Sequence, residues 1–367
     1  MIVRIEDLKD VCAKISSALD ESENDQITGV LKLFSEDNLL YLIVSNREQY
    51  VKAKIDTHSN QNFDATVKAS LFLNLISKTT SDTVEFKVEE NYLEVVCNGT
   101  YKLPLIFGED GELLSVPDIA IENVNLKFNV NKDILKSISV YNAQEIKTAT
   151  VFLKPINRMF YIDEHGCITY SNTACVNNFE LEKPIKLLLD IKTVNLFKLF
   201  NDTDVTVEFG VSEENGEAKY RIKFYDSVIS VSSKLNMTDI PSFKADAIRK
   251  VTFDDYRYSV SVNRVSILGA VDRLLLFYNP ASKSIPSATF EFDKESVKIT
   301  GANGNSETIY YDNNESLSGG YKAVLDLRDV KATLGKCVES HVTMNFGNSQ
   351  SFVIARGNVY NTIPEMS

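Results

Sequence analysis

The segment Tyr321–Phe346 contains a strand, a short helix and a second strand, and this unit recurs along the chain. An apolar run first indicates a strand, apolar residues then return every three or four positions, and strict alternation indicates the next strand. These three groups are Val324, Leu325 and Leu327; Val330, Leu334, Cys337 and Val338; and Val342, Met344 and Phe346. Related openings occur at Ile2–Leu19, Ala65–Thr79, Leu126–Tyr141, Ile185–Phe200 and Tyr258–Leu276. Six copies in 367 residues leave about 61 residues for each, a period that constrains the fold more than any single motif.

Each copy reads as a strand, a helix and a three-strand meander, and two copies form a unit of about 115 residues. A connector with two glycines, a proline and four acidic residues follows at Gly108–Asp118, and a second connector, around Pro241, follows at Asn236–Ile248. The sequence therefore predicts an α+β protein of three similar domains, at residues 1–119, 120–247 and 248–367. Three unrelated α+β domains with a shared average composition remain an alternative, because short strand–helix patterns arise easily.

The strongest turn signal is Glu214-Asn215-Gly216-Glu217, which lies between the segments Val205–Val211 and Ala218–Phe224. Asn-Gly supplies the positive φ angles that a type I′ turn requires. The pattern predicts a β-hairpin in the fourth copy.

The composition is typical of a soluble globular protein, with 44% apolar residues and a net charge of −12. The first ten residues include charged ones and no apolar run is long enough for a signal peptide, so we expect a cytoplasmic location. Five cysteines without a CxxC pair argue against a disulfide framework or a zinc site. The charge alone argues against wrapping nucleic acid, although a sum does not show how the basic residues are distributed.

The sequence contains no catalytic constellation. His58, His165 and His341 are isolated, and the Gly-rich phosphate loops and the GxSxG elbow are absent. Paired acids such as Glu89-Glu90 and Asp254-Asp255 fall in predicted turns, where solvation explains them better than acid–base chemistry. We expect a protein that is not an enzyme and uses no cofactor or metal.

Basic residues occur on all six predicted helices, mostly off the apolar stripe. They are Lys9, Lys14, Lys78, Lys132, Lys136, Lys192, Lys198, Arg264, Arg273, Lys331 and Lys336. If the helices face one way, an acidic protein acquires one positively charged surface, and its contacts with DNA would be to phosphates. Ordinary solvated helix faces are the alternative explanation.

Several strings, in their order and spacing, resemble the bacterial DNA polymerase III beta subunit, the sliding clamp, and its phage-borne relatives. They are TYKLPL at Thr100–Leu105, IPSF at Ile240–Phe243, NRVSILGAVDRL at Asn263–Leu274 and VYNTIPEMS at Val359–Ser367. The resemblance covers the whole chain. It implies the DNA clamp fold, with a head-to-tail homodimer closing into a six-domain ring whose helices line the hole.

The resemblance assigns three groups of residues. The DNA-facing set is Lys14, Lys78, Lys136, Lys198, Arg273 and Lys336. The expected subunit interface places Tyr101 and Leu103 against Leu274, Leu275 and Leu276 of the second copy, although an ordinary strand with alternating burial explains Tyr101 and Leu103 equally well. A peptide-binding groove between the second and third domains would be formed by Leu153, Ser171, Thr173, Val176, Pro241, Ile363, Pro364 and Met366.

The chain departs from the family pattern at Asp246, Asn361 and Glu365, which replace residues that are usually apolar or basic. These changes bear on the motif that the groove prefers. A frayed C-terminal strand is the alternative reading of the tail.

The resemblance implies a processivity factor that encircles duplex DNA and tethers a replicative polymerase. The expected partners are duplex DNA bound without sequence preference, the polymerase, a clamp loader and a second copy of the chain, with no membrane. The alternatives are a β-rich structural or scaffold protein without DNA contact and, less favoured, a hydrolase with an unfamiliar site.

Overall fold

The computed structural model consists of two compact units, Met1–Lys132 with Leu196–Asn236, and Asp133–Asn195 with Met237–Ser367. The residues described are 1–16, 19, 27–57, 62–143, 158–171, 173–200, 202–214, 216–235, 240, 243–278, 284–311, 317, 320–347 and 351–366. Each unit is built from one eight-stranded and one four-stranded antiparallel sheet.

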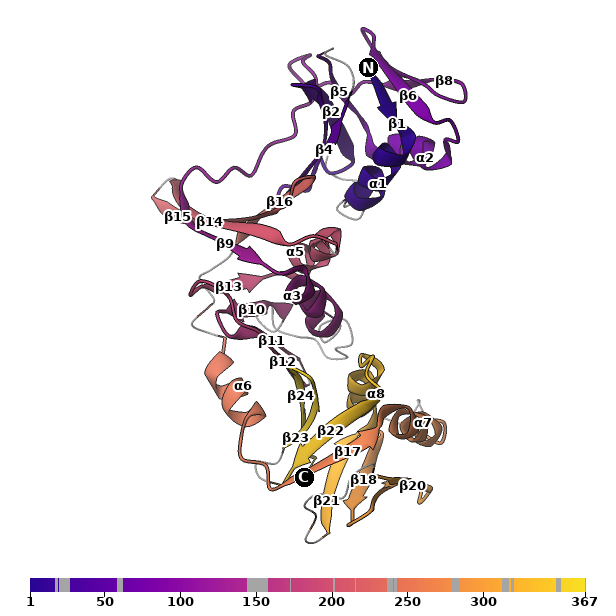
Figure 1. The fold of residues 1–367 in the computed structure, drawn as a ribbon, viewed down its shortest axis with the longest axis vertical. Helices are drawn as coiled ribbons and strands as arrows, with labels where there is room; N and C mark the ends of the chain where they lie inside the picture. The colour runs from indigo at the N-terminus through magenta and orange to yellow at the C-terminus, as the bar shows by residue number, and fades with distance from the viewer. Residues whose placement is uncertain are drawn as a thin grey trace. The chain divides into compact units, whose positions relative to one another are not determined.

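The order of elements repeats six times as strand, helix, three strands (Figure 1). The first two copies are β1 (Ile2–Arg4), α1 (Ile5–Ser16), β2 (Val30–Glu36), β3 (Leu39–Ser45) and β4 (Gln49–Asp56), then β5 (Asp64–Lys68), α2 (Ala69–Lys78), β6 (Thr83–Val88), β7 (Tyr92–Val96) and β8 (Thr100–Pro104). The next two are β9 (Val124–Val130), α3 (Lys132–Ser137) with the helical turn η1 (Ile138–Asn142), β10 (Phe160–Asp163), β11 (Gly166–Tyr170) and β12 (Ala174–Asn178), then β13 (Lys186–Leu189), α5 (Ile191–Asn195) with η3 (Leu196–Phe200), β14 (Val205–Glu214), β15 (Glu217–Tyr225) and β16 (Ile229–Leu235). The last two are β17 (Tyr258–Asn263), α7 (Arg264–Leu275), β18 (Ser287–Phe292), β19 (Ser296–Gly301) and β20 (Ser306–Tyr310), then β21 (Tyr321–Asp326), α8 (Leu327–Gly335), β22 (His341–Phe346), β23 (Ser351–Arg356) and β24 (Val359–Pro364). The predicted repeat is therefore confirmed.

The eight-stranded sheets join halves that are distant in sequence. In the first unit the strand order is β5-β2-β3-β4-β16-β15-β14-β9, and in the second it is β13-β10-β11-β12-β24-β23-β22-β17. The joints are the β4–β16 pair, with Val51 opposite Val231, and the β12–β24 pair, with Val176 opposite Tyr360. The predicted middle domain, 120–247, is thus shared between the two compact units, and the three-domain division stays a prediction.

The predicted hairpin is present, since β14 and β15 pair from Thr206–Tyr225 to Glu214–Glu217. Gly216 has a φ of 77°, which a glycine adopts without strain. Both strands are longer than predicted: β14 continues past Val211 to Glu214, and β15 begins at Glu217 and ends at Tyr225.

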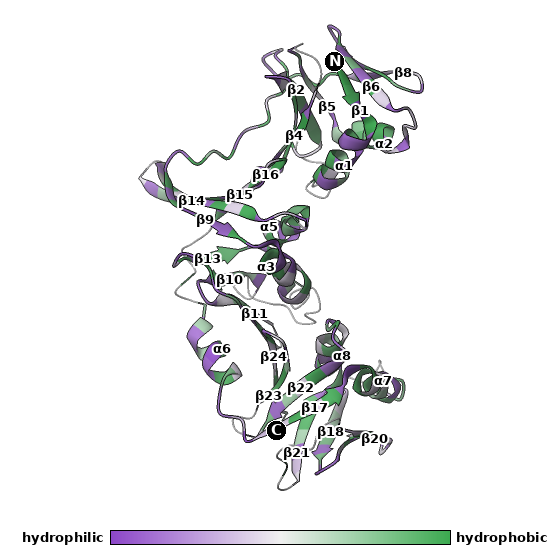
Figure 2. Cartoon of the chain, viewed as in Figure 1, coloured by the Kyte–Doolittle hydropathy of each residue, from purple (hydrophilic) through white to green (hydrophobic). Residues whose placement is uncertain are grey.

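The sequence predicted a connector at Asn236–Ile248, but the structure has a helix, α6, at Ala245–Thr252. Its residues Ala245, Ile248 and Thr252 recur at helical spacing and lie toward the sheet, where α6 contacts β12 and β24. In Figure 2 the helix carries both hydrophilic and hydrophobic residues, as expected of a helix with one covered face. The connector was predicted because of Pro241, which lies outside the described residues.

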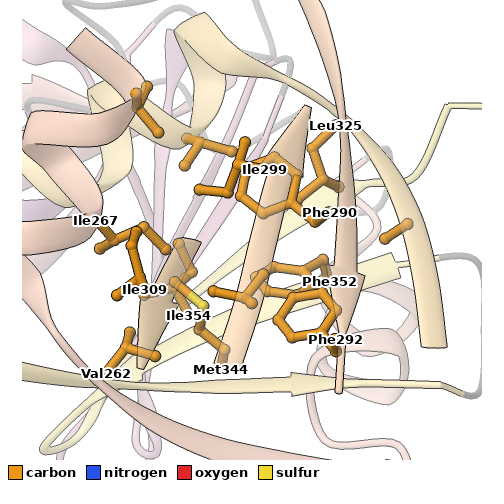
Figure 3. Packing of buried hydrophobic residues seen from close by; sticks show 14 of the residues in the cluster. Val262, Ile267, Phe290, Phe292, Ile299, Ile309, Leu325, Met344, Phe352 and Ile354 are labelled. Atoms are coloured by element: carbon orange, nitrogen blue, oxygen red, sulfur yellow. The ribbon is translucent and has the colours of Figure 1, made fainter. Parts of the chain in front are cut away.

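A large core lies in the second unit, where strands β17–β24 and helices α7 and α8 enclose one apolar cluster (Figure 3). Leu325, Val330 and Leu334 of the defining repeat are buried there, as the pattern predicted. Val338 is 76% exposed, because α8 ends at Gly335 and the helical spacing does not continue to it.

We expect Phe292→Ala to destabilise the second unit by about 3–5 kcal/mol, because it leaves a cavity in a closely packed core. The Phe292 ring stacks on Phe346 with centroids 4.1 Å apart. Chemical denaturation measures the change. The control Val338→Ala removes an exposed side chain and should change the free energy of unfolding by less than about 0.5 kcal/mol. Equal effects of the two substitutions would contradict the assigned core.

Candidate functional site

One face of the second unit's large sheet carries a straight row of apolar residues. Strand register places Leu188 opposite Tyr161, Tyr161 opposite Ile168, Ile168 opposite Val176, and Val176 opposite Tyr360. Residues directly opposite in neighbouring strands share one face, so these five side chains form a continuous apolar floor.

The segment that includes α6 covers part of this floor. Phe243 stacks on Tyr161 with centroids 5.2 Å apart and meets Tyr170 edge-on at 5.6 Å. Ala245 is buried in the same cluster, and Ile240 and Ile248 pack against it. The burial of these residues holds the chain against the sheet within the segment Asn236–Ile248, where the sequence predicts a connector.

An ion pair fixes α6 to β10. The guanidinium of Arg249 donates to both carboxylate oxygens of Asp163, at 2.5 and 2.6 Å. This hydrogen bonding, more than the opposing effect of burial, raises the pKa of Arg249. In the same last turn of the helix the hydroxyls of Thr252 and Thr362 lie 2.9 Å apart, which connects α6 to β24. The two contacts together hold the last turn of α6 against the sheet.

Beside the covered part, apolar side chains stay accessible. Tyr170, Met159 and Tyr360 are only partly buried against the cluster. Phe253 is exposed and packs edge-on against Tyr360 at 4.9 Å. We call the accessible surface formed by Met159, Tyr170, Phe253 and Tyr360 the α6 surface.

The predicted groove residues fall into different places. Val176 is fully buried in the floor, and Thr173 is buried while Ser171 is partly exposed in the turn between β11 and β12. Leu153 and Pro241 lie outside the described residues. The sequence analysis did not identify Tyr170 and Tyr360 as site residues. The β12–β24 pairing brings these two tyrosines, from β11 and β24, to the same face of the sheet.

The C-terminal tail differs most from the expectation. Ile363 is fully buried in the core cluster around Phe352, opposite which it pairs, so it faces away from the α6 surface. Pro364 is exposed, and the backbone N–H of Met366 donates to Val324 O at 2.8 Å. Glu365 accepts hydrogen bonds from the Tyr321 hydroxyl at 2.8 and 3.0 Å. The tail is anchored, which argues against fraying.

Of the two other departures from the family pattern, Asn361 has a structural role. It is fully buried and its side-chain oxygen accepts from Arg356 at 2.8 Å. Arg356 is itself buried, and its guanidinium lies 4.5 Å from the Tyr141 ring centroid. Asp246 lies in the first turn of α6, where its charge suits the positive end of the helix dipole.

The predicted DNA-facing cations are not equivalent. Lys78, Lys136 and Lys198 are exposed. Lys14 is half-buried and forms an ion pair with Asp10 at 2.9 Å, and Arg273 binds Glu307 through two nitrogens at 2.8 and 2.5 Å. Lys336 is only 8% exposed, at the C-cap position of α8, so little of its side chain lies on the surface, and its DNA-facing place stays a prediction.

The predicted interface residues also divide by burial. Leu103 and Leu274 are buried within their own units and Leu275 packs partly against the core, whereas Tyr101 is exposed and Leu276 is 79% exposed. The neighbouring Phe277 is 64% exposed. Tyr101 lies on β8 and Tyr310, also exposed, lies on β20, and these strands each form an outer edge of a four-stranded sheet.

Nothing in the described residues points to a metal site or a membrane span. There is no group of three or more His, Cys, Asp or Glu side chains arranged for a metal within them. No helix in the same residues is long and apolar enough to cross a membrane.

Solved structures match this architecture along its whole length. The DNA polymerase sliding clamp of Bacillus subtilis matches with a TM-score of 0.78 at 15% identity, covering 100% of this chain and 98% of that one. The DNA polymerase III subunit beta of Pseudomonas aeruginosa matches with a TM-score of 0.80 at 13% identity, covering 100% and 99%. The chain has the fold of a bacterial DNA sliding clamp. The Helicobacter pylori beta clamp bound to a DNA ligase peptide matches with a TM-score of 0.75 at 14% identity, covering 100% and 99%.

The sequence itself gives no such match. No family model matches the chain, and no curated protein matches it either. The sliding-clamp fold is therefore built here from a largely different set of side chains.

We expect Arg249→Ala to destabilise the second unit by about 3–5 kcal/mol, because it leaves the Asp163 carboxylate buried without its counter-ion. The Asp163 side chain is 5% exposed. Denaturation in guanidinium chloride, followed by tyrosine fluorescence, measures the loss. The control Lys322→Ala breaks a pair with Glu291 in which the lysine is 72% exposed, and it should cost less than about 1 kcal/mol. A loss for Arg249→Ala no larger than for the control would contradict the anchoring role of the buried pair.

Proposed function

We propose that the chain is a sliding clamp, a processivity factor without catalytic activity that encircles duplex DNA and tethers a replicative polymerase. The observation that carries this proposal is the match of the entire chain to clamp structures. The proposed organisation is three clamp domains, 1–119, 120–247 and 248–367. Its partners are duplex DNA, the polymerase, a clamp loader and a second copy, in a bacterial cytoplasm or a phage-infected cell.

Ring closure by two copies is supported by the sheet edges. β8 and β20 each end a four-stranded sheet, and an unpaired edge strand is a template for pairing with another chain. Exposed Tyr101 accompanies the first edge, and exposed Leu276, Phe277 and Tyr310 accompany the second. A head-to-tail dimer that joins β8 of one copy to β20 of the next would cover both edges and these apolar side chains together.

The proposal is tested by the assembly state of the protein. Sedimentation at micromolar concentration should give a dimer, and electron microscopy should show a ring with a central hole. Leu276→Glu with Phe277→Glu should give folded monomers, because both side chains are exposed in the single chain and their replacement does not disturb its core. The matched pair Val338→Glu and Val265→Glu, exposed in the same unit, should leave the dimer intact. A wild-type monomer, or a dimer without a hole, would favour the scaffold alternative.

Direct contact with DNA is expected to be weak and independent of sequence. The net charge of −12 disfavours tight binding, whereas Lys78, Lys136 and Lys198 offer exposed ammonium groups on helices or helical turns. Non-specific contacts of ~10⁻⁴–10⁻⁶ M hold phosphates yet permit sliding. A closed ring does not need a higher affinity for DNA, because a ring that encircles the duplex cannot dissociate from it sideways.

We expect the triple variant Lys78→Glu, Lys136→Glu and Lys198→Glu to weaken duplex binding at low salt by at least about 10-fold and to flatten the salt dependence. Fluorescence anisotropy with two duplexes of different sequence measures both effects. The control is Lys186→Glu, Lys294→Glu and Lys298→Glu, which changes the net charge equally at exposed positions outside the helices. Equal weakening by both triples would assign the effect to overall charge and not to the helix lysines.

For partner proteins, the proposed contact is a short peptide with apolar anchors bound at the α6 surface. Each buried anchor contributes ~1.5–3 kcal/mol before ordering costs, so single-peptide affinity should be near micromolar. Tethering beside the primer end raises the effective concentration of the polymerase, which turns weak contacts into long residence.

We expect Tyr360→Ala with Phe253→Ala to reduce binding of a peptide from the cognate polymerase by at least about 10-fold, with the ring intact, because both rings are part of the accessible apolar surface. Isothermal titration measures the affinity. Pro364→Ala with Met366→Ala tests the tail, and is preferable to deleting residues 363–367 because deletion would remove Ile363 from the core. Full-strength binding by both variants would contradict the proposed peptide site.

A further inference from the structure

A hollow of about 220 Å³ lies on the large sheet of the first unit, and no part of the function proposed above uses it. It is lined by side chains from β3, β4, β15 and β16, at the joint between the two halves of the sheet. We call it the lysine pocket and define it by Tyr41, Lys52, Lys54, Lys223, Tyr225 and Ser230.

Strand register places these residues on one face. Tyr41 is opposite Lys54, Lys52 is opposite Ser230, and Ser230 is opposite Tyr225. Lys223 is two residues before Tyr225 and shares its face, since side chains alternate along a strand. The same face carries Ile43 and Tyr50, which are covered by Val116 and Ile119 of the connector after β8.

The row of residues through the pocket contrasts with the apolar row in the second unit. It reads Lys32, Ile43, Lys52, Ser230 and Tyr225 across five strands. Where the second unit has a floor suited to apolar anchors, the first has lysines, a hydroxyl and a tyrosine. The pocket is therefore suited to a different class of ligand.

Three ammonium groups meet at the pocket, and Glu208, the carboxylate directly opposite Lys223 in the strand register, is bound to Lys127 and Tyr225. Within the described part of the chain, Lys52, Lys54 and Lys223 form no ion pair. Burial lowers the pKa of Lys52, and the charges of Lys223 and Lys54 act in the same direction, while Asp118 and Glu36 partly oppose them. Lys127, on the same sheet, differs because it binds Glu208 at 2.9 Å.

The acidic residue that lines the pocket is already engaged. One oxygen of Asp226 accepts from the backbone N–H groups of Val228 and Ile229, at 2.7 and 2.8 Å. The other accepts from the Thr203 hydroxyl at 2.6 Å. The carboxylate stabilises the turn before β16 and does not pair with the pocket lysines.

Aromatic rings hold two of the cations in place. The ammonium nitrogen of Lys52 lies 4.1 Å from the Tyr41 ring centroid and 5.2 Å from that of Phe34. The nitrogen of Lys223 lies 5.1 Å from the Tyr225 centroid. Cation–π contacts of this kind restrict the side chains without neutralising them, so less ordering is needed when an anion binds.

We propose that the lysine pocket binds the carboxylates of an acidic peptide segment from a partner protein. Its size suits one or two side chains and not a chain of nucleotides. The ring faces that a nucleobase would stack on are occupied by lysines. Lys52 and Lys54 lie on β4 and Lys223 lies on β15, with β16 between these strands. Carboxylates spaced along an extended peptide can therefore each meet a different ammonium group.

The test is titration of the full-length protein with a fluorescein-labelled hexapeptide of alternating Asp and Glu, followed by anisotropy. The acidic peptide should bind and the matching Asn/Gln peptide should not, and binding should weaken as salt is raised. Lys52→Gln with Lys223→Gln should reduce the affinity at least 10-fold. Lys298→Gln with Lys294→Gln, exposed in the second unit, is the matched control and should bind as the unchanged protein does.

Circular dichroism and thermal melting establish that the pocket variant is folded, and the single variant Lys54→Gln, at an exposed position, provides a second measure that should weaken binding about threefold or more. Equal binding by the acidic and neutral peptides, or unchanged binding by the pocket variant, would overturn the proposal. Tighter binding of inorganic phosphate or of a thymidine hexanucleotide, lost in the same variant, would also overturn it and assign the pocket to phosphate. None of these outcomes depends on ring closure or on the α6 surface, so the pocket and the proposed clamp function fail separately.

Discussion

The structure depends on backbone pairing between strands that are far apart in sequence. β4 pairs with β16 in one unit and β12 with β24 in the other, and each joint turns two four-stranded halves into one eight-stranded sheet. A half-sheet alone would expose a row of unpaired N–H and C=O groups at this edge. Because the joint satisfies them, the elements on either side are held in register, and the side chains on each face form continuous rows.

The two joints are built alike but present different chemistry. In the second unit the row that includes Val176 and Tyr360 is apolar, and α6 packs over part of it. In the first unit the row that includes Lys52 and Ser230 is mostly polar, and the connector residues Val116 and Ile119 cover the apolar Ile43 and Tyr50 on the same face. A repeated backbone thus supplies two surfaces, one suited to apolar anchors and one suited to carboxylates.

Charge is distributed locally in a protein whose sum is strongly negative. Many lysines and arginines are neutralised by partners, as Arg249 is by Asp163 and Arg273 by Glu307. Others, such as Lys78 and Lys198, are exposed on helices, and three lysines meet at the pocket in the first unit. The candidate anion-binding surfaces are therefore those where basic side chains form no ion pair. The net charge of −12 does not show where these surfaces are.

The sequence by itself determined the repeating unit, because strand and helix periods depend on local spacing of apolar residues. The defining repeat was predicted correctly at Leu325, Val330 and Met344, and the Asn-Gly hairpin was found where expected. Resemblance of a few strings to the clamp family also led to the correct fold. The tertiary structure decided which distant strands pair, because the local spacing of apolar residues carries no information about long-range pairing. The β4–β16 and β12–β24 pairings bring together residues about 180 positions apart, and only this register assigns Ile363 to the core, places Tyr360 beside Val176, and gathers Lys52 with Lys223.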